Sequence, residues 1–431
     1  MKPTDTPALL GGIPVRDKPL PPYNTIGAEE KAAVMEVLDD GELSGFIAYA
    51  GKEFWGGKRV QAVEEAFRRR FGVAHAISVN SATSGLHCAL AATGIGPGDE
   101  VIVPPYTMSA SATAVLFTGA VPIFCDIDDR TFCLDVVAVE AAITPQTRAI
   151  VAVNLFGQPA PLDALRALAD RRGLYLIEDN AQAPAAMHHG RYSATIGHAG
   201  VFSFNRHKTM QCGEGGVVVT GDERLALKMA LVRNHGEVVV GAMGIEDIVN
   251  TAGLNYRMTE MEAAVALVQF NRLDSLNARR VELADRLSAG LVGIPGLTAP
   301  YIAPGNTHVY YFYPIKFSAE VIGMPRELFC RAVQAEGFTL RAGYVKPLYL
   351  EPLYQRKLCF GAHGFPFSAN IRNDHVSYAR GICPVVERLA DHELMVTNII
   401  YPPLAESDMD AFVEACGKVI RNRDALLAAN P

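Results

Sequence analysis

Short runs of apolar residues alternate with stretches of helical periodicity through the first 260 residues of the chain. Val60, Val63, Phe67 and Phe71 recur at the spacing of one helix face and predict an amphipathic helix. Strand-length apolar runs then appear in HAISV, VIVPP, VPIFCDI, AIVAVNLFG, LYLIEDN, GVFSF and GVVVT. Strands of this length separated by helices predict an α/β fold with a mostly parallel seven-stranded sheet flanked by helices.

The alternation fades after about residue 260. GLNYRMTEMEAAVALVQFNRLDSLNARRVELADRLSAGL predicts a long helix or two helices in succession. The turn signals GIPGL and APG mark a boundary, and beyond it the half-buried strand pattern HVYYFYPIKF and helical segments over 326–336 and 408–421 predict a smaller α+β domain. We therefore expect an N-terminal arm over 1–30, a large domain over 31–295 and a small C-terminal domain over 296–431.

One stretch of the expected small domain has no clear period. Residues 352–383 are rich in aromatic residues, histidine and glycine. Stretches of that length without secondary structure are usually functional or disordered. The aromatic content favours an ordered loop with a function.

Composition and charge narrow the classes of partner. The chain has 431 residues, 49% of them hydrophobic, and a net charge of −7, which is typical of a globular protein. Its longest basic run is Arg68 to Arg70, so we expect no nucleic-acid partner. The N-terminal segment has only a short apolar run, so neither a secretory signal nor a membrane span is expected. The eight cysteines include no CxxC pair, which favours buried thiols in a cytoplasmic protein.

The segment VNSATSGLHCALAATGI predicts an anion site. Ser81, Ala82 and Thr83 follow a predicted strand and begin a predicted helix. Free backbone N–H groups and small hydroxyls at a helix N-terminus bind anions such as phosphate. Simple capping of the helix by Ser81 is the alternative.

Polar residues also follow the strand pattern LYLIEDN. Glu178, Asp179 and Gln182 lie at its carboxyl end, where open α/β sheets bind ligands. A carboxylate there could hold a magnesium ion, act as a base or pair with a protonated ring nitrogen. A strand-end turn without a ligand is the alternative.

Lys208 is the candidate nucleophile. The segment SFNRHKTMQCGEGG places it before Gly213, Gly215 and Gly216, whereas a nucleotide-binding P-loop needs its glycines before the lysine so that backbone amides cradle phosphate. The reversed order excludes a P-loop. A lysine at the ligand end of a sheet, downstream of an anion site and a strand-end aspartate, suits a Schiff base with pyridoxal phosphate.

Seven segments in register resemble the DegT/DnrJ/EryC1/StrS family of pyridoxal-phosphate-dependent sugar aminotransferases of fold type I. They are FWGGKRVQAVEEAF, NSATSGLHCAL, GPGDEVIVPPYT, GAVPIFCDID, IEDNAQAPAA, SFNRHKTMQCGEGGVVVT and GLNYRMTEMEAAVAL. The resemblance implies amino transfer from glutamate or glutamine to the keto group of a nucleotide-linked or free sugar or a cyclitol. It implies pyridoxal 5'-phosphate as cofactor, joined to Lys208 as a Schiff base, with pyridoxamine 5'-phosphate as the intermediate.

The resemblance also implies roles for single residues. Lys208 takes the place of the catalytic lysine, and Asp179 that of the aspartate that keeps the pyridinium nitrogen protonated. Gln182 takes the place of the residue that contacts the 3-hydroxyl of the cofactor. The phosphate contacts fall on Ser81, Ala82, Thr83, Ser203 and, from a neighbouring subunit, Asn255. A homodimer with shared active sites is therefore expected.

The resemblance leaves two assignments to choose: the residue that packs on the cofactor ring and the residue at the catalytic position. In PPYTM the sequence departs from the family's aromatic stacking residue, so Met108 or, with a shifted turn, Tyr106 would pack on the cofactor ring. A related branch replaces the lysine by histidine and dehydrates ketosugars. His207 falls one place early in the register set by GEGG, so amino transfer is favoured over dehydration. A cofactor-binding regulator without turnover is the other alternative, although no DNA-binding helix-turn-helix is found.

The acceptor stays open among nucleotide-linked, free or phosphorylated ketosugars and cyclitols. We expect acceptor specificity over Tyr344 to Cys383, which departs most from the shared pattern. The candidate contacts with the acceptor are His308, Arg341, Tyr344, Lys346, His363 and Arg372.

Two further motifs favour structural roles. MHHG contains His188 and His189 with no third metal ligand nearby in the sequence, so we expect turn residues and no metal site. RNHGE, from Arg233 to Glu237, predicts a helix end followed by a glycine in a special conformation.

Overall fold

A seven-stranded sheet forms the centre of the computed structural model, which describes residues 5–248, 251–369 and 375–430. The strand order is β1-β9-β8-β5-β4-β2-β3. Their bounds are β1 His75–Val79, β2 Glu100–Val103, β3 Val121–Phe124, β4 Thr147–Val153, β5 Tyr175–Asp179, β8 Ala199–Ser203 and β9 Gly216–Thr220. β9 is antiparallel to β1 and β8, and the other four pairings are parallel. The mostly parallel seven-stranded sheet is thereby confirmed, and each of the seven apolar runs contains part or all of one strand.

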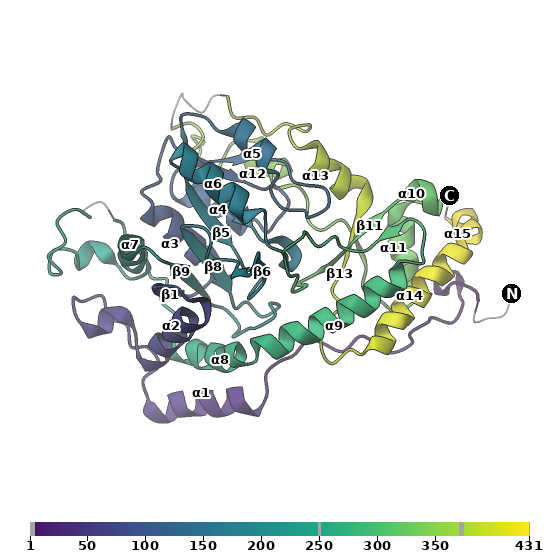
Figure 1. The fold of residues 1–431 in the computed structure, drawn as a ribbon, viewed down its shortest axis with the longest axis horizontal. Helices are drawn as coiled ribbons and strands as arrows, with labels where there is room; N and C mark the ends of the chain where they lie inside the picture. Colours follow the sequence, from purple (N-terminus) through teal and green to yellow (C-terminus); the bar gives the residue numbers. More distant parts are fainter. Residues whose placement is uncertain (1–4, 249–250, 370–374, 431) are drawn as a thin grey trace.

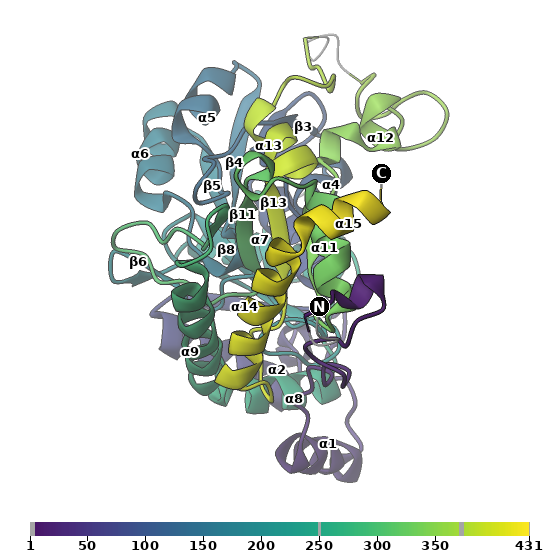
Figure 2. The ribbon, with the colours of Figure 1, turned by 90° about the vertical axis from the view of Figure 1, so that its right-hand side faces the viewer.

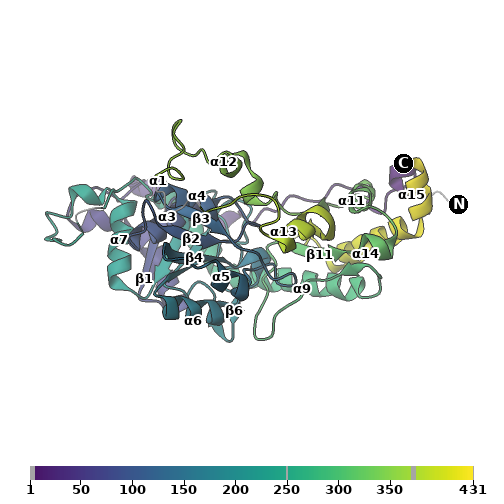
Figure 3. The ribbon, with the colours of Figure 1, turned by 90° about the horizontal axis from the view of Figure 1, so that it is seen from above.

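Helices cover both faces of this sheet, as Figure 3 shows for α3 and α4 on one side and α5 and α6 on the other. The first face carries α3 (Ala82–Ala92), α4 (Ala110–Phe117) and α7 (Glu223–Arg233). The second carries α2 (Lys58–Phe71), α5 (Val136–Ala142), α6 (Leu162–Arg172) and α8 (Glu260–Asn271). β9 is buried on both sides, and its side chains alternate between the two faces. Val218 joins the core under α3, whereas Val217 and Val219 join the core under α2 and α8.

A second, antiparallel sheet lies to the right of the first in Figure 1. Its order is β10-β11-β13-β12, with bounds β10 Leu297–Thr298, β11 Tyr313–Phe317, β12 Arg341–Ala342 and β13 Leu394–Thr397. α9 (Leu273–Leu291), α11 (Arg326–Ala335) and α14 (Glu406–Arg421) pack on it around their own core. The long helix expected after residue 260 is two helices, because α8 ends at Asn271 and α9 begins at Leu273.

The N-terminal segment is fastened to this second core and runs beside α11 and α14 in Figure 2. The buried carboxylate of Glu336 accepts hydrogen bonds from the backbone N–H groups of Ala8 and Val15 and from Lys418 Nζ. The remaining elements are short or peripheral: α1 Ala28–Asp40, β6 Met187–His188, β7 Arg191–Tyr192, α10 Ala319–Ile322, α12 Pro352–Gln355, α13 Pro384–Arg388 and α15 Arg423–Ala429, with several 3-10 turns. Among the described helices, none has the length and apolar character that crossing a membrane requires.

The described part of the stretch over 352–383 packs on the large sheet. Tyr354 and Tyr378 contact the ring of Phe124 at centroid distances of 5.0 and 5.7 Å. The hydroxyl of Tyr378 donates to the carbonyl of Pro122 at 2.8 Å. These buried rings give the stretch an ordered base beside β3.

The turn after α7 corrects one expectation. α7 ends at Arg233, as predicted, but the left-handed residue is His235 (φ 49°) rather than the glycine. Gly236 is needed for space, because a Cβ there would lie 2.5 Å from the Cβ of Leu231. The prediction of a special glycine conformation was therefore wrong: close packing, and not φ, requires this glycine.

Candidate active site

Lys208 lies on the connection between β8 and β9, at the carboxyl end of the parallel strands. The connection folds back on itself, since Lys208 N donates to the carbonyl of Asn205 at 2.8 Å and Asn205 pairs with Gly213. Gly213 (φ 94°) and Gly215 (φ 138°) adopt backbone conformations that favour glycine. The glycines thus shape the return into β9 and leave the lysine side chain facing the sheet edge.

The Lys208 side chain is nearly inaccessible, with an exposed fraction of 8%. Its Nζ lies 4.2 Å from the centroid of the Tyr311 ring. Burial lowers the pKa of Lys208 from 10.5 to about 8, against the opposing influence of Asp179. About a tenth of the amine is therefore neutral at pH 7, and this is the form that a nucleophile or a proton acceptor requires.

The lowered pKa of Lys208 makes stability depend on pH. Its folded pKa of about 8 lies below the ordinary value of 10.5, so the unfolded chain binds more protons between these values and stability rises with pH through that window. We expect Lys208→Met to raise the free energy of unfolding of the cofactor-free protein by up to about 3 kcal/mol at pH 7. The gain should fade between pH 8 and 10.5.

Urea denaturation of both proteins at several pH values measures that difference. Lys346→Met is the matched control, because it removes a lysine whose side chain is 52% exposed and should change the free energy of unfolding only slightly. A constant difference between Lys208→Met and wild type from pH 7 to 10.5 would contradict the expectation.

Asp179 ends β5 and faces the same cavity as Lys208. Its Oδ2 accepts from Ser111 Oγ at 2.7 Å and its Oδ1 from the backbone N–H of Ala181 at 3.2 Å. The preceding Glu178 points to the other face of the strand, where it accepts backbone N–H groups at 2.6 to 2.8 Å from Ala194, Ile196 and Gly197. Burial raises the pKa of Glu178. Glu178 therefore holds a loop, and Asp179 is the carboxylate available to a ligand.

Gln182 is held by two contacts next to Asp179. Its Oε1 accepts from the backbone N–H of Phe156 at 2.8 Å, and its Nε2 donates to the hydroxyl of Tyr344 at 3.1 Å. The backbone N–H of Tyr344 in turn donates to the hydroxyl of Tyr106 at 2.9 Å. Gln182 thus joins β5 to the chain segment that follows β12.

Ser81 caps α3, and its Oγ accepts from the backbone N–H of Ser84 at 3.1 Å. The cap leaves the first-turn N–H groups of Ala82 and Thr83 without an intrahelical partner, as at any helix start. The capping role and an anion site are therefore compatible at this turn.

One cavity brings together most of the residues predicted from the sequence. It is lined by Ser81, Ala82, Thr83, Met108, Asp179, Gln182, Ser203 and Lys208, among others. Met108 is 59% exposed and lines the cavity, whereas Tyr106 is fully buried and does not line it. Asn255 is exposed on its own chain, where it pairs with Asn234 outside this cavity.

The predicted acceptor contacts are scattered. Arg341 and Tyr344 line a second cavity of about 480 Å³, which shares His207 with the first. His308 lines neither cavity. It is buried, and its Nδ1 accepts from the backbone N–H of Tyr310 at 3.0 Å. Lys346 pairs with Glu351 at 3.6 Å. His363 is exposed outside both cavities, and Arg372 lies outside the described residues.

Sequence reasoning missed several residues of these cavities. Arg206 and Arg280 line the second cavity together with Arg341. Arg206 lies two positions before Lys208 in the quoted motif, so its closeness to the lysine could have identified it as a site residue. Arg280 lies on α9 among several other charged residues, and its position in the sequence does not distinguish it from them. Thr107 lines the first cavity and is nearly fully buried.

Comparison with known proteins finds one family and several relatives. The profile described as the DegT/DnrJ/EryC1/StrS aminotransferase family matches residues 25–394. The chain is 36% identical to the L-glutamine:2-deoxy-scyllo-inosose aminotransferase of Streptoalloteichus tenebrarius, over 98% of this chain and 99% of the relative. It is 38% identical to the dTDP-3-amino-3,4,6-trideoxy-alpha-D-glucose transaminase of Streptomyces venezuelae, over 77% and 82%. The crystal structure of S. venezuelae DesV superposes with a TM-score of 0.77 at 34% identity, over 91% and 94% of the two chains.

Proposed function

Because this chain belongs to the DegT/DnrJ/EryC1/StrS aminotransferase family, we propose that it moves an amino group from glutamine or glutamate to the keto group of a cyclitol or sugar. The observation that carries the proposal is a single cavity in which a buried lysine of lowered pKa, a strand-end carboxylate and a helix N-terminus converge. Relatives named for amino transfer to an inosose and to a dTDP-linked sugar support the two acceptor classes.

The groups around this cavity fit pyridoxal 5'-phosphate. The first turn of α3 and the Ser203 hydroxyl suit a phosphate, and Asp179 suits a protonated ring nitrogen. Thr107 Oγ1 is buried, and no described residue forms a hydrogen bond with it, so a ligand would supply its partner. Lys208 would bind the aldehyde carbon of the cofactor, Gln182 would contact its 3-hydroxyl, and Met108 would pack on one face of its ring.

The reaction would then divide between the cofactor and the protein. When bound, pyridoxal phosphate supplies an electrophilic carbon and a ring that accepts an electron pair. Lys208 Nζ, neutral in part because of its burial, takes the proton from the α-carbon of the amino donor and moves it across the cavity. The hydrogen bond from Ser111 fixes the Asp179 carboxylate, which would pair with the positive ring nitrogen of the bound cofactor. In the second half-reaction Lys208 returns a proton to the carbon of the acceptor.

The second cavity is the proposed entrance for the substrates. Arg206, Arg280 and Arg341 bring three guanidinium groups to its wall. Arg280 is fixed, because its Nη1 donates to the carbonyl of Tyr310 at 3.1 Å and its guanidinium lies 4.9 Å from the ring centroid of Tyr23. Arginine pairs well with carboxylates and phosphates. We infer that this wall receives the carboxylates of the amino donor and any acidic group of the acceptor.

We also propose a homodimer with shared active sites. Asn255 is exposed and does not reach the cavity of its own chain, which is compatible with a phosphate contact across a subunit boundary. Large apolar side chains are exposed in the segments that contact it, since Leu254 precedes it and Asn234, its partner, donates to the carbonyl of exposed Ile47. Exposed apolar side chains that lie close together are typical of a surface that binds another protein subunit.

The alternatives have less support. His207 lines the edge shared by the two cavities, and burial followed by the charge of Lys208 lowers its pKa. Lys208 nevertheless lines the first cavity together with Asp179, as amino transfer needs and ketosugar dehydration by a histidine branch does not. A regulator without turnover would not need the proton-transfer group that Lys208 provides.

The donor half-reaction tests the proposed function. Purified protein with pyridoxal phosphate should show a visible absorption band that borohydride removes, and glutamine or glutamate should bleach it. Adding 2-deoxy-scyllo-inosose, scyllo-inosose or a dTDP-ketosugar should restore the band and release an amine detectable by mass spectrometry. A band that no amino donor bleaches would refute amino transfer and leave a cofactor-binding protein.

A further inference from the structure

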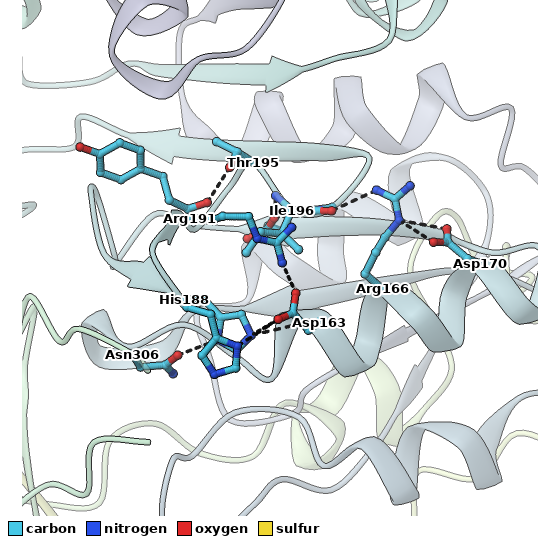
Figure 4. A network of polar contacts seen from close by, with 12 residues as sticks. Asp163, Arg166, Asp170, His188, Arg191, Thr195, Ile196 and Asn306 are labelled. Atoms are coloured by element: carbon cyan, nitrogen blue, oxygen red, sulfur yellow. Dashed lines mark hydrogen bonds and ion pairs between the residues drawn. The ribbon is translucent and has the colours of Figure 1, made fainter. Parts of the chain in front are cut away.

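A cluster of metal-ligating side chains lies outside the active site, at the start of α6 (Figure 4). Asp163 is in the first turn of α6, His188 ends β6, and His189 begins the turn to β7. Asp163 Oδ2 lies 3.3 Å from His188 Nε2 and 3.1 Å from His189 Nδ1. One ligand atom from each residue falls within 4.8 Å of the other two. The third group could not be recognised beside the two histidines, because Asp163 lies 25 positions before His188.

Oxygen acceptors orient both imidazole rings. His188 Nδ1 lies 2.6 Å from Asn306 Oδ1, and His189 Nε2 lies 3.3 Å from the carbonyl oxygen of Pro304. Asn306 Nδ2 donates to the carbonyl of Pro159, so its Oδ1 is the atom left for His188. Because these oxygens accept, each of the two ring nitrogens donates. In the tautomer set by these oxygens the lone pairs lie on His188 Nε2 and His189 Nδ1, the nitrogens that face Asp163 Oδ2. In the other tautomer of His189, Nδ1 donates to Asp163 Oδ2 at 3.1 Å.

Two of the three spacings between the ligand atoms fit a tetrahedral metal site. Zinc–ligand distances of about 2.0–2.1 Å place neighbouring ligands of a tetrahedron about 3.3 Å apart, close to the 3.1 and 3.3 Å separations from Asp163 Oδ2. Charge-assisted N–H···O contacts are usually shorter, about 2.7–2.9 Å. Ring nitrogens that donate their other N–H to an amide or carbonyl oxygen are the arrangement that surrounds metal-bound histidines.

We propose that Asp163, His188 and His189 bind one Zn²⁺ ion, with water in the fourth position. Two imidazoles and a carboxylate suit Zn²⁺ among the common divalent ions. The exposed fractions of the Asp163 and His189 side chains, 45% and 54%, leave an open approach for the ion and its water, while His188 is 8% exposed. The cluster depends neither on the cofactor nor on the proposed amino transfer.

Three existing contacts compete with the ion. Arg191 pairs with Asp163 Oδ1, the oxygen that faces away from the histidines, and its side chain is 54% exposed and free to turn toward solvent. The backbone N–H of Asp163 donates to His188 Nε2 at 3.4 Å, a long hydrogen bond. His189 Nδ1 and Asp163 Oδ2 also form a hydrogen bond at 3.1 Å when the proton is on Nδ1. The ion thus displaces two hydrogen bonds and shares the carboxylate with one surface arginine.

Metal binding would join two segments that lead to the active site. His189 N donates to the carbonyl of Gly305, and Thr307 N donates to the carbonyl of Met187. From there the chain continues through His308 to Tyr311, whose ring lies against Lys208. The ion would therefore stabilise the position of this segment, without taking part in the reaction.

Zn²⁺ titration of the holoenzyme tests the site. The protein, purified without a polyhistidine tag and stripped with a chelator, should take up a single equivalent of Zn²⁺ in isothermal titration calorimetry and show a higher Tm when loaded. Asp163→Asn and His189→Ala should each weaken binding at least about tenfold, and Asn306→Ala, which removes the acceptor for His188, about 10- to 100-fold. Arg191→Gln should bind Zn²⁺ as tightly as wild type or more tightly.

Matched controls keep the result specific. Asp170→Asn changes another exposed carboxylate of α6, one that pairs with Arg166, and His392→Ala removes an exposed histidine far along the chain. Both should bind Zn²⁺ like wild type. Wild-type affinity in Asp163→Asn and His189→Ala would overturn the proposal, as would the failure of the wild type to bind an equivalent of Zn²⁺. Co²⁺ spectra distinguish this site from a cysteine site, since thiolate charge-transfer bands should be missing.

Discussion

Replacement of Lys208 by alanine is expected to abolish covalent retention of pyridoxal phosphate and to lower kcat for amino transfer by at least about 10⁴-fold. The side chain is the nucleophile and the proton carrier in the proposed reaction, and its burial supplies the neutral amine that both tasks require. Absorption spectra before and after borohydride, mass spectrometry of the reduced protein and steady-state rates measure the two effects.

The neighbouring histidine provides a close control for Lys208. His207→Ala removes a side chain of the same connection that lines both cavities, yet it should retain the borohydride-sensitive band and most of the covalent labelling. If Lys208→Ala kept the band, or if His207→Ala alone lost it, the assignment of the catalytic position would have to move to His207. Circular dichroism confirms that both variants are folded.

The seven strands of the large sheet could be predicted from the sequence because they are short, apolar and separated by helices. Convergence of the site also followed from this architecture. The segments bearing Ser81, Asp179 and Lys208 all follow strands that run in one direction, and the carboxyl ends of such strands meet at one edge of the sheet. Local patterns and one topological rule were enough to bring these residues together.

Other features of the fold and the cavities could not be predicted, because they depend on contacts between distant segments that no local pattern encodes. Arg280 reaches the second cavity because α9 crosses toward the segment of Tyr310, and its helical position alone resembled a solvated one. The pairing of Asp163 with His188 arises because the first turn of α6 lies against the hairpin of β6 and β7. Gly236 is required by the proximity of Leu231. These features are set by the packing of elements, which periodicity does not describe.

The carboxylate at the end of β5 gives the second large expected effect. We expect Asp179→Asn to lower kcat by about 10²- to 10³-fold with a smaller change in the KM of the amino donor. The amide has the shape of the carboxylate and can still accept from Ser111, but it lacks the negative charge that keeps the ring nitrogen protonated. Rapid-mixing measurements of the donor half-reaction report this step directly.

Ser111→Ala separates the charge of Asp179 from its orientation. It removes the 2.7 Å hydrogen bond to Oδ2 and leaves the carboxylate in place, so a loss of about tenfold is expected, the usual worth of one hydrogen bond to a charged group. Wild-type kcat in Asp179→Asn would contradict the assigned role. Protonation of Lys208 cannot explain a slow Asp179→Asn enzyme, because Asp179 raises the pKa of Lys208. Loss of the Asp179 charge would leave more of the Lys208 amine neutral. A fall in kcat would therefore show that Asp179 acts on the ring nitrogen and not through Lys208.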